Sequence, residues 1–248
     1  MTKTVWLYDS HCPYNIPLKP LISYLKDEQP QVFGLGGDNI DFGCISHWND
    51  ANFRHIGFDQ VRKNLKHEAG LFREQLAAFR RALPKSDIIY IPGNHEAWLT
   101  GFCEKYPQMG EGMDLESLLG LKKLKIKLQP NRAFYKLGKL YFCHGDQVSG
   151  QKPAEKFVTR YQRNIVFGHF HSCEIAPNYS PLDSKNRHMA IQVPCYRTLE
   201  ADYMNGKATK WCHGFFWAHI RPSGNFTAGL QFVSPDGAFI TQSGKEYR

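Results

Sequence analysis

Five short fragments of the sequence combine side chains of the kinds that hold metal ions in proteins. In chain order they are Asp9-Ser10-His11, Gly37-Asp38-Asn39-Ile40-Asp41, Gly93-Asn94-His95-Glu96, His144-Gly145-Asp146 and Gly168-His169-Phe170-His171. Their donor atoms are carboxylate oxygen, amide oxygen and imidazole nitrogen, with no thiolate among them. That mixture suits Mn²⁺, Fe, Zn²⁺ or related ions rather than Cu(I) or an iron–sulfur cluster.

The position of these fragments says more than their composition. Any one of them alone is weak, because Gly-Asp and Asn-His pairs are common in ordinary turns and caps. Four of the five, however, directly follow an apolar, strand-like run, and both Asp9/His11 and His169/His171 place two donors on the same side of an extended segment. The five fragments together predict a metal centre.

Strands and helices alternate along the first part of the chain. The spacing of apolar residues predicts strands over Thr4–Tyr8, Val32–Leu35 and Asp87–Ile91, and helices over Ile16–Glu28 and Arg54–Leu83. This alternation favours parallel strands joined by helical crossovers. In open α/β sheets, functional sites form in the loops at the carboxyl ends of the strands, where the first three fragments fall.

The later half of the sequence is mostly strand-like. Strands are expected over Leu121–Gln129, Ala133–Leu137, Leu140–His144, Ile165–Gly168, His188–Pro194, Trp211–Ile220 and Phe226–Val233, with a helix near Ala154–Gln162. The sequence shows no internal repeat, low-complexity linker or domain boundary. We therefore expect residues 1–248 to form a single domain.

Composition narrows the class of protein. The chain has 248 residues, with 31 Lys and Arg against 23 Asp and Glu, which gives a formal charge of +8. A hydrophobic content of 42% is that of a folded protein. The positive charge suggests an anionic partner such as nucleic acid. The sequence contains no apolar run long enough to span a membrane, and its start lacks the apolar stretch of a signal peptide. Its seven cysteines are scattered, as is usual for reduced thiols. We therefore expect a cytoplasmic protein.

At the five fragments the sequence resembles the calcineurin-like metallophosphoesterase superfamily. The family pattern is Asp-x-His, Gly-Asp-x-x-Asp, Gly-Asn-His-Asp/Glu, a later His and Gly-His-x-His, and all its elements occur here in order. The segment 193–216 is also similar to the tails of phage- and prophage-type members, which would place the protein in a host-cell cytoplasm. The resemblance implies a four-layer α/β/β/α sandwich, with two mixed sheets flanked by helices.

The resemblance also implies two divalent metal ions, with Mn²⁺ as first choice and Fe, Zn²⁺ or Ni²⁺ as alternatives. One ion would be held by Asp9, His11, Asp38 and His171, and the other by Asp38, Asn94, His144 and His169. Asp38 would then bridge the ions, and a metal-bridging hydroxide would attack a phosphate ester in line. Two cations about 3.5 to 4 Å apart stabilise both the attacking and the leaving oxygens of such a reaction.

Further residues of these fragments are expected to act on the substrate. In the family, the histidine that matches His95 contacts the phosphoryl group or protonates the leaving oxygen. Asp41 would orient this ring through a hydrogen bond. Asn94 is expected to contact the substrate as well as a metal ion. Glu96 is expected to form a structural hydrogen bond rather than to bind metal.

The sequence departs from one branch of the family after Asp41. Protein phosphatases of the superfamily continue with Arg-Gly, and that arginine binds the phosphate, whereas this chain continues with Phe42-Gly43. A Ser/Thr protein phosphatase is therefore disfavoured. A cation for the phosphate must come from elsewhere, and the nearest candidates in the sequence are Arg54 and His55.

Taken together, these features predict a metallophosphoesterase, and the charge favours a phosphodiesterase that acts on nucleotides or nucleic acid. One alternative is a phosphomonoesterase, including a phosphoprotein phosphatase. An alternative of another class is a nucleic-acid-binding protein with a structural or degenerate metal centre. The sequence does not indicate an oligomeric state.

Overall fold

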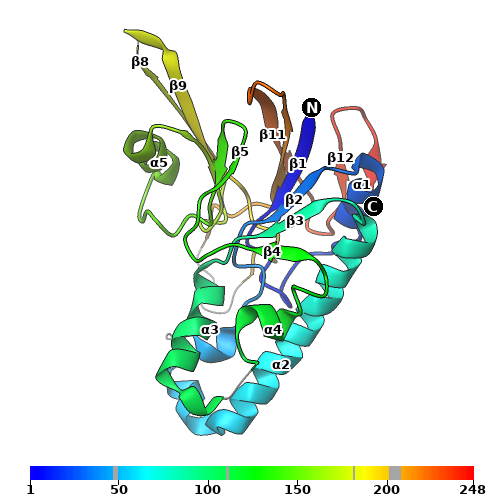
Figure 1. The fold of residues 1–248 in the computed structure, drawn as a ribbon, viewed down its shortest axis with the longest axis vertical. Helices are drawn as coiled ribbons and strands as arrows, with labels where there is room; N and C mark the ends of the chain where they lie inside the picture. Colours follow the sequence, from blue (N-terminus) through cyan, green and yellow to red (C-terminus); the bar gives the residue numbers. More distant parts are fainter. Residues whose placement is uncertain (47–49, 110–111, 181, 201–207) are drawn as a thin grey trace.

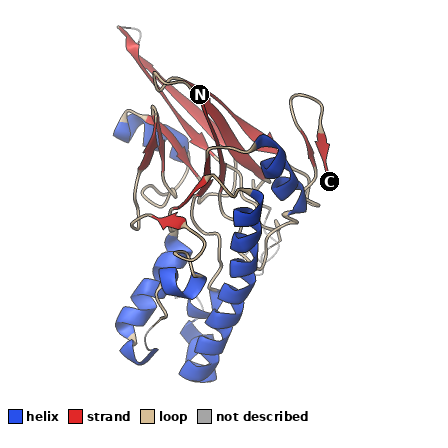
Figure 2. Cartoon of the chain, turned by 45° about the vertical axis from the view of Figure 1, so that its right-hand side comes forward, coloured by secondary structure: helices blue, strands red, loops and turns tan. Residues whose placement is uncertain are grey.

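Two β-sheets packed face to face form the centre of the protein, here in a computed structural model (Figure 1). The structure describes residues 1–46, 50–109, 112–180, 182–200 and 208–248, and leaves the side chains at 50–56, 109, 180 and 183–186 undescribed. Helices cover the outer face of each sheet (Figure 2). In the described part of the chain, no helix has the length and apolar character needed to cross a membrane.

The first sheet has the strand order β11-β10-β1-β2-β3-β4. Its parallel strands are β1 (Thr2–Leu7), β2 (Val32–Leu35), β3 (Asp87–Tyr90) and β4 (Ile126–Leu128). Two antiparallel strands, β10 (Gly214–Ile220) and β11 (Phe226–Phe232), extend it beyond β1. The parallel pairing expected from the alternating sequence pattern is thus confirmed.

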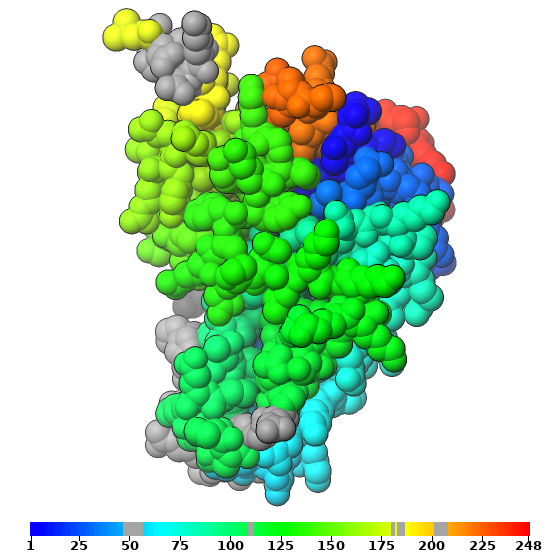
Figure 3. Space-filling model, in the orientation of Figure 1, coloured from blue at the N-terminus to red at the C-terminus, as the bar shows by residue number. Residues whose placement is uncertain are grey.

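The second sheet has the order β5-β6-β7-β9-β8. Its strands are β5 (Tyr135–Leu137), β6 (Leu140–Phe142), β7 (Asn164–Phe167), β8 (Glu174–Ser180) and β9 (Asp183–Gln192). The three central strands run parallel, and both edge strands are antiparallel. The described side chains of the β8–β9 hairpin, yellow-green to yellow in Figure 3, lie at one edge of the molecule. Strands β12 (Phe239–Ile240) and β13 (Glu246–Tyr247) form a separate small hairpin.

The helices lie on both sides of the paired sheets. On the first sheet lie α1 (Lys19–Glu28), α2 (Asp50–Ala82, with a break at Gly57), α3 (Asn94–Lys105) and α4 (Leu115–Leu119), while α5 (Pro153–Tyr161) packs on the second. Short 3₁₀ turns occur at Gly43–Ile45 and Pro107–Met109. The layers therefore follow the order helix, sheet, sheet, helix.

The apolar core follows from the alternation of side chains along the strands. On β1, Val5 and Leu7 point toward the helices, whereas Trp6 points into the space between the sheets. The Trp6 ring stacks on Phe142 of the second sheet, with 4.0 Å between ring centroids. On the outer side of that sheet, Phe157 of α5 packs against Phe167. The predicted α/β/β/α sandwich of two mixed sheets is confirmed.

Several element boundaries differ from those predicted. Strand β8 was not predicted, and β9 begins at Asp183 rather than His188. Helix α1 begins at Lys19 rather than Ile16, with Pro20 in its first turn, where the missing N–H of proline leaves no helical hydrogen bond unmade. Of the expected strand Leu121–Gln129, only β4 is extended. The first residues of the expected strand instead end helix α4. There Gly120 adopts a left-handed conformation, and the Leu121 N–H donates to the carbonyl of Glu116.

Candidate metal centre

The five fragments meet at one edge of the sandwich. Asp9 follows β1, Asp38 follows β2, and Asn94 opens α3 directly after β3, all at the carboxyl ends of parallel strands. His144 follows β6, and His169 and His171 follow β7, in the parallel part of the second sheet. Because the two sheets face one another, fragments far apart in the sequence share one site.

The first group of donors consists of Asp9, His11 and His171, whose ligand atoms all lie within 4.8 Å of one another. The Nε2 atoms of His11 and His171 are 3.2 Å apart, and Asp9 Oδ1 lies 3.7 Å from His171 Nε2. Two nitrogens bound to one tetrahedral Zn²⁺ are separated by about 3.3 Å, given bond lengths of about 2.0 to 2.1 Å. The spacing of the two imidazoles therefore suits one shared cation.

The second group consists of Asp38, His144 and His169, also within 4.8 Å of one another. His144 Nε2 lies 3.3 Å from Asp38 Oδ2 and 3.2 Å from His169 Nδ1. Asn94 joins this group, since its Oδ1 is 3.1 Å from His144 Nε2. A third group, His11, Asp38 and His95, also lies within 4.8 Å, so the Asp38 carboxylate stands between the first two groups, where a bridging ligand would be.

Asp9 provides a test of whether these residues fit a cation. Its Oδ2 accepts a hydrogen bond from the His169 N–H at 2.8 Å, but its buried Oδ1 has no hydrogen-bond partner among the described residues. Burial raises the pKa of this carboxyl well above its usual value. A bound cation would satisfy the unpaired oxygen and favour the ionised form. The donor set therefore fits two divalent ions.

Two of the imidazoles are oriented by hydrogen bonds on their outer nitrogens. His11 Nδ1–H donates to Asp41 Oδ1 at 2.9 Å, and His144 Nδ1–H donates to the carbonyl of Gly36 at 3.1 Å. In each ring this leaves Nε2 directed toward the centre. Such outer partners set the tautomer of metal-binding histidines and increase their basicity.

The backbone is strained at the predicted ligands. Positive φ angles occur at Asp9 (50°), His11 (47°), Asp38 (48°), His169 (72°) and His171 (60°). A side chain in this region costs on the order of 1–3 kcal/mol and persists only where surrounding contacts hold it, most often at functional sites. Here the loops hold one another, since the N–H groups of the first fragment bond to carbonyls of the second.

Glycines allow the fragments to approach closely. A Cβ atom at Gly93 would lie 2.2 Å from Asp38 Oδ1, and one at Gly168 would lie 2.4 Å from Asp9 Oδ2. Both distances are far below van der Waals contact. The glycines that open the third and fifth fragments are therefore required for the carboxylates to reach their positions.

Glu96 holds the loops together, as the sequence predicted. Its carboxylate accepts hydrogen bonds from the N–H groups of Asp38 at 2.9 Å, Asn39 at 2.9 Å and Gly93 at 2.8 Å. The hydroxyl of Tyr90 donates a fourth at 2.6 Å. Each carboxylate oxygen of Glu96 thus accepts two hydrogen bonds, so neither oxygen is available to bind a metal ion.

Charge is distributed unevenly among the imidazoles. Burial lowers the pKa of His144, but the neighbouring Asp38 outweighs it and raises the value to about 10. Burial lowers the pKa of His11 and of His169 to about 4. For Asp38, burial favours the neutral acid, but the charge of His144 outweighs burial and holds the pKa well below its usual value. The metal-free centre thus contains a His144–Asp38 ion pair.

We predict that binding of Mn²⁺ or Zn²⁺ at pH 7.5 releases at least one proton. His144 is protonated at that pH and must become neutral before its Nε2 can bind metal. Calorimetric titrations in two buffers with different ionisation enthalpies would measure the release, and a His144→Gln variant should release about one proton fewer. Equal release by the two proteins would contradict the prediction.

The hydrogen bond expected between Asp41 and His95 is present, but a different group of Asp41 makes it. His95 Nδ1–H donates to the main-chain carbonyl of Asp41, while the Asp41 carboxylate bonds to His11. The carboxylate Oδ1 is 3.7 Å from His95 Nδ1. The turn at Phe42, with a φ of 49°, directs the carbonyl toward His95, which the residue types alone could not reveal.

The two cations predicted to bind phosphate fall on the first turns of α2. Arg54 and His55 belong to α2, but their side chains lie outside the described residues. Sequence reasoning missed Arg197, which is buried with Nη1 3.9 Å from Asp41 Oδ1. His213 Nε2–H donates to the carbonyl of Arg197 at 2.9 Å, so this histidine helps to hold the Arg197 backbone in place. No sequence signal marked Arg197, because it follows none of the five fragments.

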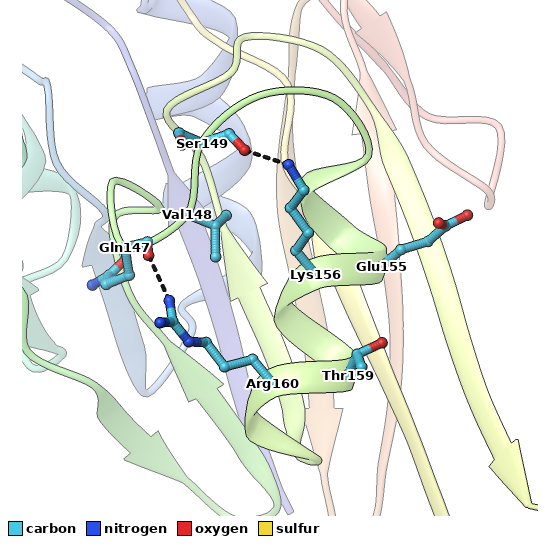
Figure 4. A pocket seen from close by; sticks show the side chains of 7 residues that line it. All are labelled: Gln147, Val148, Ser149, Glu155, Lys156, Thr159 and Arg160. Carbon is cyan, nitrogen blue, oxygen red and sulfur yellow. Dashed lines mark hydrogen bonds between the residues drawn. The ribbon is translucent and has the colours of Figure 1, made fainter.

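A cavity of about 540 Å³ opens onto the centre. It is lined by His11, Asp38, Asp41, Gly43, Ser46, Asn94, His95, Trp98, His169, His171 and Trp211. A second hollow, of about 620 Å³, lies beside α5 (Figure 4). There Lys156 and Arg160 donate to the carbonyls of Ser149 and Gln147, so both cations serve to hold the loop that follows His144. Of these two cavities in the described part of the chain, the first is the one lined by candidate metal ligands.

Glu68 of α2 supports the second fragment from behind. Its carboxylate accepts a hydrogen bond from the Phe42 N–H, and burial raises its pKa to about 8. A carboxyl whose pKa is higher in the folded state than in the unfolded chain stabilises the fold at low pH. That contribution is lost as the pH rises from about 4.5 to about 8.

We therefore predict that Glu68→Gln removes the loss of folding stability that the Glu68 carboxyl causes as the pH rises. The amide still accepts from Phe42 but does not ionise, so the variant should be more stable than the parent at pH 8, by roughly 3 kcal/mol, and similar to it at pH 5. Urea unfolding at the two pH values measures the difference. Glu74→Gln, an exposed glutamate on the same helix, is the control. A stability difference independent of pH would refute the prediction.

Comparisons with known proteins find likeness only at the level of structure. No family model and no curated protein matches the chain. Similar solved structures include Vps29 of Entamoeba histolytica complexed with Zn²⁺ (11% identity, TM-score 0.44, covering 92% of this chain and 97% of that one). Another is Vps29 of Chaetomium thermophilum (11% identity, TM-score 0.44, covering 93% of this chain and 97% of that one). A third is a dimetal phosphatase from Danio rerio (10% identity, TM-score 0.41, covering 89% of this chain and 93% of that one). Likeness this distant says nothing of activity, which must be argued from the side chains.

Proposed function

We propose that the chain is a dinuclear metal-dependent phosphoesterase of the calcineurin-like superfamily. The observation that carries the proposal is the meeting of two donor groups, one on each side of Asp38, at the floor of an open cavity. Structural metal sites are closed by their ligands, whereas catalytic sites keep a position open for water or substrate. The cavity favours a catalytic centre over a structural one.

The residues around the centre have separable roles in such a reaction. When bound, the two ions would lower the pKa of a water molecule and neutralise charge on the phosphoryl group. Asp38 would hold both ions, and Asn94 and His95 would face the substrate in the cavity. Because the Nδ1–H of His95 donates a hydrogen bond to the Asp41 carbonyl, the Nε2 atom is the one available to protonate a leaving oxygen.

A phosphodiester of a nucleotide or nucleic acid is the substrate class we favour. The position that carries arginine in protein phosphatases is Phe42, which is buried. A monoester dianion needs more cationic contacts than a diester monoanion, so loss of that arginine favours the diester. The formal charge of +8 also favours a polyanionic substrate.

Turnover of simple esters by Mn²⁺-loaded protein tests the proposal. We expect hydrolysis of bis-p-nitrophenyl phosphate in preference to p-nitrophenyl phosphate, with loss of activity in EDTA and recovery with added metal. Activity no greater than that of an Asp38→Asn variant on both esters would argue against an enzyme. Preference for the monoester would support a phosphomonoesterase instead.

Nucleic acid as a partner requires a separate experiment. Binding of single- and double-stranded DNA or RNA is measured across a salt series. A surface that binds phosphates through Lys and Arg must lose affinity steeply as salt rises, because counterions are released on binding. Absence of binding at low salt would restrict the substrate to small phosphodiesters.

A further inference from the structure

Five aromatic rings form a continuous row through the site. His11 is the middle ring, with centroids 4.6 Å from His95 and 5.0 Å from His171. Trp98 lies against His95 at one end, with 3.9 Å between centroids, and Trp211 lies edge-on to His171 at the other, at 4.4 Å. Each end of the row of imidazoles is therefore occupied by an indole, and both indoles line the cavity.

Both tryptophans are held in place, yet both remain partly exposed. Trp98 belongs to α3, the helix that also carries Asn94 and His95, so its position relative to the centre is set by that helix. The guanidinium of Arg197 lies over the ring of Trp211, 5.6 Å from its centroid. Since Arg197 is itself buried, Trp211 is packed against a rigid support.

The faces of the indole rings are unsuited to the phosphate itself. The face of an aromatic ring carries partial negative charge, which repels an anion and attracts flat, uncharged π-systems. The phosphoryl group belongs at the metal ligands and His95, a few ångströms from the rings. The tryptophans are therefore placed to contact the part of the ester that lies next to its phosphate.

We propose that Trp98 and Trp211 provide a subsite at each end of the row, where the nucleobase of a nucleotide ester stacks on an indole while its phosphate lies at the metal centre. This inference rests on the proposed phosphoesterase function. A cavity of about 540 Å³ is within the range of about 300 to 1,000 Å³ that holds small-molecule ligands. Stacking on an aromatic side chain tolerates any base, because every base has a π-face. The subsite selects for the presence of a base rather than for its identity.

Two esters with the same leaving group test the subsite. Thymidine 5′-(p-nitrophenyl phosphate) carries a base, and methyl p-nitrophenyl phosphate does not. We expect Mn²⁺-loaded protein to prefer the first. In the leucine variant of the tryptophan that the base occupies, Trp98→Leu or Trp211→Leu, the ratio of kcat/KM between the two esters should fall by about 10-fold, mainly through KM, as expected for loss of one stacked base.

Phenylalanine variants of the two tryptophans and a variant of a remote tryptophan serve as controls. Trp98→Phe and Trp211→Phe keep an aromatic face and should retain most of the preference. Trp217→Phe, on β10 and outside the cavity lining, should leave the ratio unchanged. If both esters are hydrolysed and neither leucine variant changes the ratio, the subsite is refuted while the phosphoesterase function stands.

A binding experiment separates the two proposals if neither ester is hydrolysed. Isothermal titration calorimetry of the Mn²⁺-loaded protein measures the affinity for thymidine 5′-monophosphate and for deoxyribose 5-phosphate. Tighter binding of the nucleotide, lost in one of the leucine variants, would support the subsite even though the proposed reaction had failed. Equal affinity for the two ligands would overturn the subsite.

Discussion

Replacement of Asp38 by asparagine is expected to lower phosphodiester turnover by on the order of 1,000-fold, and to reduce the bound metal from two ions per chain to one or none. Asp38 stands between the two donor groups, with Oδ2 3.3 Å from His144 Nε2. A neutral amide supplies no charge to hold two cations close together. Elemental analysis of dialysed protein and steady-state kinetics on bis-p-nitrophenyl phosphate measure the two effects.

The asparagine variant should keep the local fold. Asp38 Oδ1 accepts a hydrogen bond from the His95 N–H at 2.9 Å, and an amide oxygen can accept the same bond. Asp87→Asn is the matched control, because Asp87 is a surface residue that pairs with Lys127 and should show full activity and metal content. A variant at position 38 that binds two ions and retains activity would refute the bridging role.

The grouping of the candidate metal ligands could be predicted from sequence because strand geometry determines where these residues lie. Asp9, Asp38 and His144 follow short apolar runs that form buried strands, and parallel strands bring their carboxyl ends to the same edge. Pairing of the two sheets face to face then brings the later fragments to the earlier ones. Neither step requires knowledge of the loops.

The surroundings of the ligands could not be predicted in the same way. Helix α3 begins at Asn94, inside a fragment interpreted as a loop, so Trp98 was not recognised as part of the site. Arg197 and Trp211 reach the centre because the segment after β9 runs beside the first fragment, where the Tyr196 N–H bonds to the carbonyl of Asp9. Such contacts depend on tertiary packing rather than on local spacing. They leave no periodic signal in the sequence.

His95→Ala is expected to have its largest effect on esters with poor leaving groups. A positioned general acid contributes about 10²- to 10⁴-fold when the leaving oxygen must be protonated, and much less when the leaving group is stable as an anion. We therefore expect kcat to fall by about 10-fold for a p-nitrophenyl diester and by about 1,000-fold for an alkyl diester. Rates measured for diesters whose leaving alcohols increase in pKa would separate these cases.

The contacts of His95 make its substitution a direct test of which group protonates the leaving oxygen. Its Nδ1–H is committed to the Asp41 carbonyl, and its Nε2 lies 3.9 Å from Asp38 Oδ2, on the side of the metal ligands. Loss of the ring should leave metal content unchanged, because His95 holds no ion in the proposed centre. His67→Ala, at an exposed position on α2, is the control. If the dependence on leaving-group pKa is equally steep with and without His95, the ring does not act as the proton donor, and its role is reduced to contact with the phosphoryl group.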